Sequence, residues 1–222
     1  MPGETLRDFL SRPALEVAPA LLGAHLSANG VTVRLTEVEA YHGAGDPGSH
    51  AFRGLTARTR VMFGEAGHLY AYVSYGMHTC ANVVTGPVGE ASAILFRAGE
   101  IIEGTDLVRS RRLTSKRDSD LASGPARLCV ALGITLTDTG IDLVKEGPIT
   151  LRPMDGSRST LPDAGDLRRL ADHGIRASPR TGVAGPGGTA DFPWRFYLEH
   201  DPTVSPYRVA APRKLSPSRR PK

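Results

Sequence analysis

Residues 69–84 have the sequence LYAYVSYGMHTCANVV. β-Favouring apolar residues lie on both sides of a tip at residues 75–78, which predicts two strands joined as a hairpin. Gly76 can adopt the positive φ angle that a tight hairpin turn requires. We therefore expect a protruding hairpin at this point of the chain.

The hairpin is rich in tyrosine. Three of the six tyrosines of the chain, Tyr70, Tyr72 and Tyr75, lie within it. An aromatic side chain at an exposed tip, with Met77 beside it, would favour aggregation, but it suits a wedge that enters a stack of flat rings. The alternative, that these are half-buried sheet residues, stays open for all three tyrosines and is preferred for Tyr70.

A second predicted strand carries carboxylates. In residues 31–36 (VTVRLT) apolar side chains occupy alternate positions, so one face of the strand is expected to lie against the core. The same alternation reaches Glu37, Glu39 and Tyr41. A buried carboxylate is costly unless it is paired or takes part in chemistry. The alternative is a bulge or a strand end that turns the glutamates to solvent.

The remaining pattern mixes helices and strands. Helices are expected at 5–12 with Thr5 as N-cap, early in 15–26, and at 123–134 with Ser123 as N-cap. Further strands are expected late in 15–26, around a turn at Asn29-Gly30, at 90–97, in a hairpin over 141–152, and at 194–198. Residues 42–60 hold four glycines and one proline, which predicts a long functional loop.

The composition is that of a globular protein. The chain has 222 residues, of which 40% are hydrophobic and 23% charged, ordinary values for this class. It shows no apolar run long enough to span a membrane and no secretory signal, so we expect a cytoplasmic protein, associated with the nucleoid if it is bacterial. Cys80 and Cys129 lie in apolar segments without CxxC spacing and are expected to be core residues.

The positive charge is concentrated at the C-terminus. The formal net charge is +4, yet residues 207–222 hold six basic residues and no acid, and the rest of the chain has 21 basic and 23 acidic residues, a net charge of −2. We therefore expect a single domain over residues 1–204 and a basic, disordered tail over residues 205–222 that adds phosphate contacts.

One possible chemistry is a metal site. His42, Asp46 and His50, together with Glu37 or Glu39, could supply the nitrogen and oxygen ligands of a divalent ion. Their spacing would align them on a helix, but the glycines and the proline of this segment oppose a helix. The sequence therefore disfavours a metal site.

Two other functions fit better. A non-catalytic nucleic-acid-binding protein would explain the tyrosines and the basic tail, but not an inward carboxylate, which repels phosphate. An enzyme that takes a base out of duplex DNA needs a wedge, aromatic walls for the base and a carboxylate that activates water. The sequence supplies all three, and we therefore favour the enzyme.

Several blocks of the chain closely resemble the alkyladenine (3-methyladenine) DNA glycosylase family of mammals and many bacteria. The resemblance covers residues 13–205, and the blocks are Thr36–Tyr41 (TEVEAY), Gly67–Asn82 (GHLYAYVSYGMHTCAN), Ile94–Ala98 (ILFRA), Ser123–Leu128 (SGPARL), Arg180–Val183 (RTGV) and Trp194–Tyr197 (WRFY).

The resemblance implies roles for the catalytic and wedge residues. Glu39 matches the family's general base, which activates the water that attacks C1′ of the deoxyribose. Arg97 and the carbonyl group of Val183 match groups that help to position this water. Tyr75, with Met77 beside it, matches the wedge that enters the duplex through the minor groove.

The resemblance also implies a base pocket. Tyr41 and Tyr72 match its aromatic walls, and His50 matches a histidine that packs on the other side of the base. Asn82 matches a residue at the pocket floor that tests substituents on purine N2.

The family fold implies a single mixed α/β domain with a curved, largely antiparallel sheet, flanked by helices and carrying a protruding hairpin. The implied substrate is double-stranded DNA with damaged purines, and the implied enzyme is a monomer without metal or organic cofactor. Because no lysine lies near Glu39 in sequence, we expect a monofunctional glycosylase that does not cleave the strand. The order of preference among 3-methyladenine, 7-methylguanine, hypoxanthine and ethenoadenine stays open.

Overall fold

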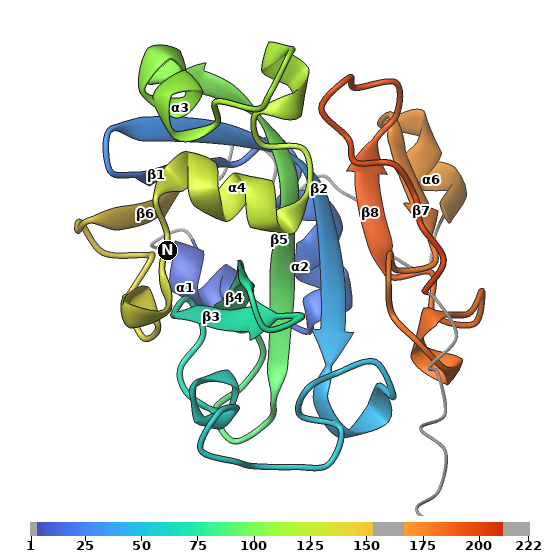
Figure 1. Cartoon of the computed structure of the whole chain (residues 1–222). Helices are drawn as coiled ribbons and strands as arrows, with labels where there is room; N and C mark the ends of the chain where they lie inside the picture. Colours follow the sequence, from blue (N-terminus) through green and yellow to red (C-terminus); the bar gives the residue numbers. More distant parts are fainter. Residues whose placement is uncertain (1–3, 153–166, 211–222) are drawn as a thin grey trace, which may run out of the picture.

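The computed structural model describes residues 4–152 and 167–210. Its centre is an eight-stranded antiparallel sheet in the order β3-β4-β5-β2-β1-β6, with β8 paired to β2 and β7 paired to β8 (Figure 1). The strands are β1 (His25–Ala28), β2 (Val31–His42), β3 (Leu69–Ser74), β4 (His78–Val84), β5 (Ser92–Glu103), β6 (Ile149–Arg152), β7 (Ile175–Ser178) and β8 (Arg195–Leu198).

Short helices cover the sheet. They are α1 (Leu6–Leu10), α2 (Ala14–Ala20), α3 (Thr105–Arg111), α4 (Pro125–Leu132) and α6 (Leu167–Asp172). Helix α4 packs on β4 and β5, and α2 packs on β2 and β5. In Figure 1, α4 crosses in front of the sheet and α2 lies behind it. The chain is thus a mixed α/β domain, and none of its described helices is long and apolar enough to cross a membrane.

Local signals near the N-terminus are confirmed. The Thr5 hydroxyl accepts the backbone N–H of Asp8, whose carboxylate accepts the Thr5 N–H, which forms a capping box at the start of α1. The turn between β1 and β2 has φ angles of 50° at Asn29 and 77° at Gly30, as the Asn-Gly pair predicts.

Strand β2 is the structural axis of the molecule. One of its edges pairs with β5 along most of its length, and the other edge pairs first with β1 and then with β8. Glu37 and Glu39 are fully buried, so the alternative of solvent-facing carboxylates is wrong. The regular alternation does not reach them, however, because Leu35 and Val38 both belong to the hydrophobic core. The register does shift at Glu37, but neighbouring strands still enclose the segment on both edges.

Three expectations of secondary structure before residue 153 are wrong. Gly124, not Ser123, is the N-cap of α4, and no side-chain hydrogen bond caps this helix. Strand β5 continues past Arg97 to Glu103, because the charge of Arg97 is paired inside the protein. Of the hairpin expected at 141–152, only Ile149–Arg152 is a strand, and it pairs with β1.

The C-terminal part holds one further strand, β7, in a region expected to be loop. It is only four residues long and forms by pairing with β8, so its own sequence carries little signal. Of the tail proposed at 205–222, residues 205–210 belong to the described structure and residues 211–222 lie outside it.

Candidate active site

The β3–β4 hairpin ends in an exposed tip. Tyr75 and Met77 are 82% and 76% exposed, and Gly76 has a φ of 75°, as predicted. Tyr75 itself has a φ of 50°, which is uncommon for a residue with a bulky side chain. Strained backbone of this kind is concentrated at functional sites.

Behind the tip lies a cavity of about 570 Å³. It is large enough for a purine nucleoside, since ligand pockets typically begin near 300 Å³. The cavity brings together residues from β2, the loop after it, the hairpin, β5 and the segment after β7. Of the residues predicted for the site, those that line it are Glu39, Tyr41, His50, Tyr72, Tyr75, Asn82, Arg97 and Val183. Met77 lies at the hairpin tip outside this lining.

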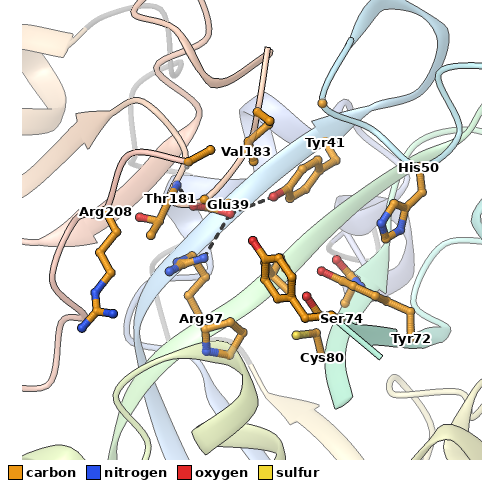
Figure 2. A pocket seen from close by; sticks show the side chains of 18 of the residues that line it. Glu39, Tyr41, His50, Tyr72, Ser74, Cys80, Arg97, Thr181, Val183 and Arg208 are labelled. Atoms are coloured by element: carbon orange, nitrogen blue, oxygen red, sulfur yellow. Dashed lines mark hydrogen bonds and ion pairs between the residues drawn. The ribbon is translucent and has the colours of Figure 1, made fainter. Parts of the chain in front are cut away.

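Glu39 lies in the wall of the cavity with all of its side chain buried (Figure 2). Its Oε1 accepts the backbone N–H of Thr181 at 2.6 Å, and its Oε2 accepts the hydroxyl group of Tyr41 at 2.8 Å. The guanidinium of Arg97 lies 3.3 Å from the same Oε2. Two hydrogen bonds and one ion pair, from three parts of the chain, therefore hold the carboxylate in one orientation, which is what a general base requires.

Arg97 is shared between two glutamates. Its Nε donates to Glu37 at 2.6 Å, while its Nη1 faces Glu39. Glu37 also accepts Nε of Arg195 at 2.7 Å and the backbone N–H of Ser205 at 2.7 Å. Burial alone would raise the pKa of Glu37, but Arg97 and Arg195 hold this pKa below its usual range. Glu37 is thus a buried anion that fixes Arg97 beside Glu39.

Aromatic rings form the opposite wall. The rings of Tyr70 and Tyr72 are stacked with centroids 5.7 Å apart, and His50 meets Tyr72 edge to face at 4.5 Å. Tyr70 is almost fully buried, in line with its assignment to the sheet. Burial raises the pKa values of Tyr41 and Tyr72, and the charge of Glu39 raises both further. Both phenols therefore stay protonated, so Tyr41 can act as a donor to Glu39.

His50 is neutral at physiological pH. Desolvation of its ring and the nearby charge of Arg58 lower the pKa of His50 to about 4, even though the residue as a whole is exposed. The imidazole of His50 therefore carries no positive charge, although the guanidinium carbon of Arg58 lies 5.5 Å from the centre of the Tyr72 ring. A neutral imidazole does not repel a cationic aromatic base, and the tyrosine face attracts one.

Asn82 lies buried in the cavity wall on β4. Its side-chain amide donates to the backbone carbonyl of Tyr70 at 2.9 Å across the hairpin. This bond holds the amide against β3 and limits the space at that end of the cavity.

Two residues that support the cavity were not identified as partners from the sequence. Asp46, considered there as a metal ligand, binds both terminal nitrogens of Arg180 at 2.6 Å. Both side chains are fully buried. Arg180 begins the segment that supplies Thr181 and Val183. Its burial and its carboxylate partner have no signature in the local sequence, since the two residues are 134 positions apart.

The candidate metal ligands are not grouped together. His42 is exposed, whereas His50 packs on Tyr72. Within residues 4–152 and 167–210, no three His, Cys, Asp or Glu side chains are arranged to hold a metal ion.

Comparison with known proteins gives a consistent result. Residues 8–202 match the family model described as methylpurine-DNA glycosylase. The chain is 49% identical over 217 residues to a protein of Streptomyces avermitilis, covering 94% of this chain and 93% of the relative. It is 51% identical over 211 residues to a protein of Leifsonia xyli subsp. xyli, covering 91% and 92%. Both relatives bear the name "Putative 3-methyladenine DNA glycosylase".

Proposed function

The chain belongs to the methylpurine-DNA glycosylase family. We propose that it performs base-excision repair by hydrolysing the N-glycosidic bond with a water molecule that Glu39 activates. The protein is a DNA glycosylase, a hydrolase of N-glycosidic bonds, and its substrate is DNA that contains damaged bases. The finer proposal is that alkylated or deaminated purines leave duplex DNA and enter the cavity beside Glu39.

The orientation of Glu39 is the observation that supports this mechanism best. As the bond between C1′ and the purine nitrogen breaks, its electron pair goes to the base, and positive charge develops on the sugar. A carboxylate beside that sugar stabilises the charge and accepts a proton from the water whose oxygen bonds to C1′. The N–H of Thr181 and the hydroxyl of Tyr41 hold the carboxylate in place. We assign the positioning of the water to Arg97 and to the carbonyl group of Val183.

The walls of the cavity favour a flat and electron-poor base. Tyr41 and Tyr72 offer π-faces, and the neutral ring of His50 adds no charge that would repel a methylated, cationic purine. Such a purine departs as a neutral base and needs no protonation. The side chain of Asn82 is held by the carbonyl group of Tyr70. We propose that it restricts the substituents that a purine can carry at this end of the cavity.

The outer part of the proposal concerns base flipping. We assign Tyr75, with Met77 beside it, to the space that the base vacates in the duplex, since both side chains are largely exposed at the hairpin tip. The proposed reaction needs one chain and one water, so we expect a monomer that acts without a metal ion or an organic cofactor.

The deciding experiment is the substitution Glu39→Gln. It keeps the size of the side chain and one acceptor oxygen but removes the base. Release of methylated purines from alkylated DNA in a single turnover should be abolished, while binding to a duplex with an abasic-site analogue should stay close to that of the wild type. Base release that survives Glu39→Gln would refute the role of Glu39. Wild-type activity should persist in EDTA, and a loss that a divalent ion restores would favour the metal-dependent alternative.

A further inference from the structure

The C-terminal segment places a cation at the cavity. Among the described residues, the arginines that line the cavity are Arg97 and Arg208. Arg97 is buried and engaged by Glu37 and Glu39. Arg208 is exposed, and within the described part of the chain its guanidinium has no hydrogen-bond or ion-pair partner. Its charge is therefore available to a ligand that approaches the cavity.

The backbone of Arg208 is fixed by a series of anchors. Ser205 is held by Glu37 through its backbone N–H at 2.7 Å and by Arg195, which donates to its carbonyl at 2.8 Å. Two residues on, the Tyr207 ring lies 6.0 Å from the guanidinium carbon of Arg195. The Arg208 carbonyl then accepts the N–H of Gly182 at 2.9 Å.

The last of these anchors joins Arg208 to residues 181–183, the segment that contacts Glu39. Gly182 lies between Thr181, which donates to Glu39, and Val183, whose carbonyl group we propose positions the water. Figure 2 shows Arg208 beyond Glu39 and Arg97, on the opposite side of the cavity from Tyr72 and His50. A nucleotide whose base lies between the aromatic walls would therefore present its sugar and phosphates towards Arg208.

The chemistry of the ligand follows from this geometry. Glu39 can activate water only if C1′ of a deoxyribose lies beside it, and the same sugar carries a phosphate on each side. Arginine binds phosphate through two parallel N–H groups. Phosphate contacts of this kind set register and orientation without reading sequence.

We propose that Arg208 binds a backbone phosphate next to the flipped nucleotide and thereby positions its sugar beside Glu39. This inference rests on the proposed function, because it takes a flipped nucleotide as the ligand. It also accounts for how a domain whose net charge without residues 207–222 is −2 can hold an anion so close to two glutamates.

Three full-length variants test the proposal. Arg208→Gln removes the charge, and Arg208→Lys keeps it. Lys145→Gln is a matched control, since Lys145 is 78% exposed in a surface pair with Asp142 and does not line the cavity. Dissociation constants should be measured across a salt series for two duplexes, one undamaged and one with a tetrahydrofuran abasic-site analogue.

On the abasic-analogue duplex, Arg208→Gln should weaken binding roughly tenfold, the lower end for a charge-assisted hydrogen bond. It should also reduce the log–log salt slope by about 0.9, the value for one phosphate contact. Arg208→Lys should retain the slope, and Lys145→Gln should match the wild type. The loss should be smaller on undamaged DNA, where no nucleotide occupies the cavity.

Two results would overturn the proposal. One is a salt slope for Arg208→Gln that superimposes on those of the wild type and Lys145→Gln. The other is an equal loss on both duplexes, which would mean a general attraction to DNA. Base release by the wild-type enzyme is measured in parallel. If the wild type releases no methylated purine, the proposed function fails, whereas a failed slope test with an active wild type refutes only the role of Arg208.

Discussion

The guanidinium carbon of Arg180 lies 4.5 Å from the centre of the Tyr41 ring. Arg180 is fully buried and does not line the cavity, whereas Tyr41 does. Arg180 therefore supports the Tyr41 ring from behind while its backbone leads into Thr181. Asp46 neutralises the buried cation, and this pair connects the loop after β2 to the segment that holds Glu39.

We predict that Asp46→Asn strongly destabilises the protein. The change leaves the Arg180 guanidinium buried without a charged partner, and breaking a buried pair in this way costs about 3–5 kcal/mol. Urea denaturation should show this as a lower midpoint. The control is Arg109→Gln, because Arg109 is 54% exposed in its pair with Asp118 and a surface pair contributes at most about 1 kcal/mol. Equal midpoints for the two variants would contradict the prediction.

Substitution of Glu37 should mainly affect stability, whereas substitution of Glu39 should mainly affect catalysis. Glu37→Gln leaves two buried arginines without their shared anion and should lower the free energy of unfolding by about 3 kcal/mol or more. Glu39→Gln, next to a cavity, should lower it less while abolishing catalysis. A Glu37→Gln protein as stable as the wild type would exclude Glu37 as a structural centre.

The effect of Glu37 should also depend on pH. Its pKa is depressed in the folded protein, so its contribution to stability is present above the ordinary carboxyl pKa of about 4.3. The contribution is lost as the pH falls through the lower, folded value. The difference in unfolding free energy between the wild type and Glu37→Gln should therefore be constant near neutral pH and should shrink in acid. A difference that grows in acid would have the wrong sign.

Tyr75→Asn can separate the role of the wedge from that of the turn. Asparagine tolerates the left-handed conformation that Tyr75 adopts with a φ of 50°, so the hairpin should fold at least as well as in the wild type. The stacking surface is lost, however, which is worth about 1–3 kcal/mol per base. Fluorescence of 2-aminopurine beside the lesion should report less unstacking than with the wild type or with Tyr75→Phe. An unchanged fluorescence signal would make Tyr75 a turn residue only.

The His50 imidazole should stay neutral through most of the acid range. An NMR titration should give a pKa of about 4, because the ring is partly desolvated and faces Arg58. Arg58→Gln removes the charge and should move the pKa of His50 upward, towards its ordinary value of about 6.5. A value near 6.5 in the wild-type protein would remove the argument that the cavity accepts cationic bases because the His50 imidazole is uncharged.

The sequence by itself determined the features that arise from neighbouring residues. The turn at Asn29-Gly30, the cap at Thr5 and the hairpin around Gly76 follow from local backbone preferences. The alternation in residues 31–35 predicted a strand with one face against the core, because side chains of a strand point alternately to opposite faces. The family could be recognised because its motifs are continuous blocks of chain.

Only the tertiary structure decided how the cavity is supported. Thr181 reaches Glu39 from 142 positions away, and Ser205 reaches Glu37 from 168 positions away. These contacts use backbone N–H groups, which every non-proline residue possesses, so the residue type does not predict them. The pairing of Asp46 with Arg180 and the position of Arg208 likewise depend on distant segments, which meet because β8 pairs with β2. No local sequence pattern predicts such contacts between distant segments.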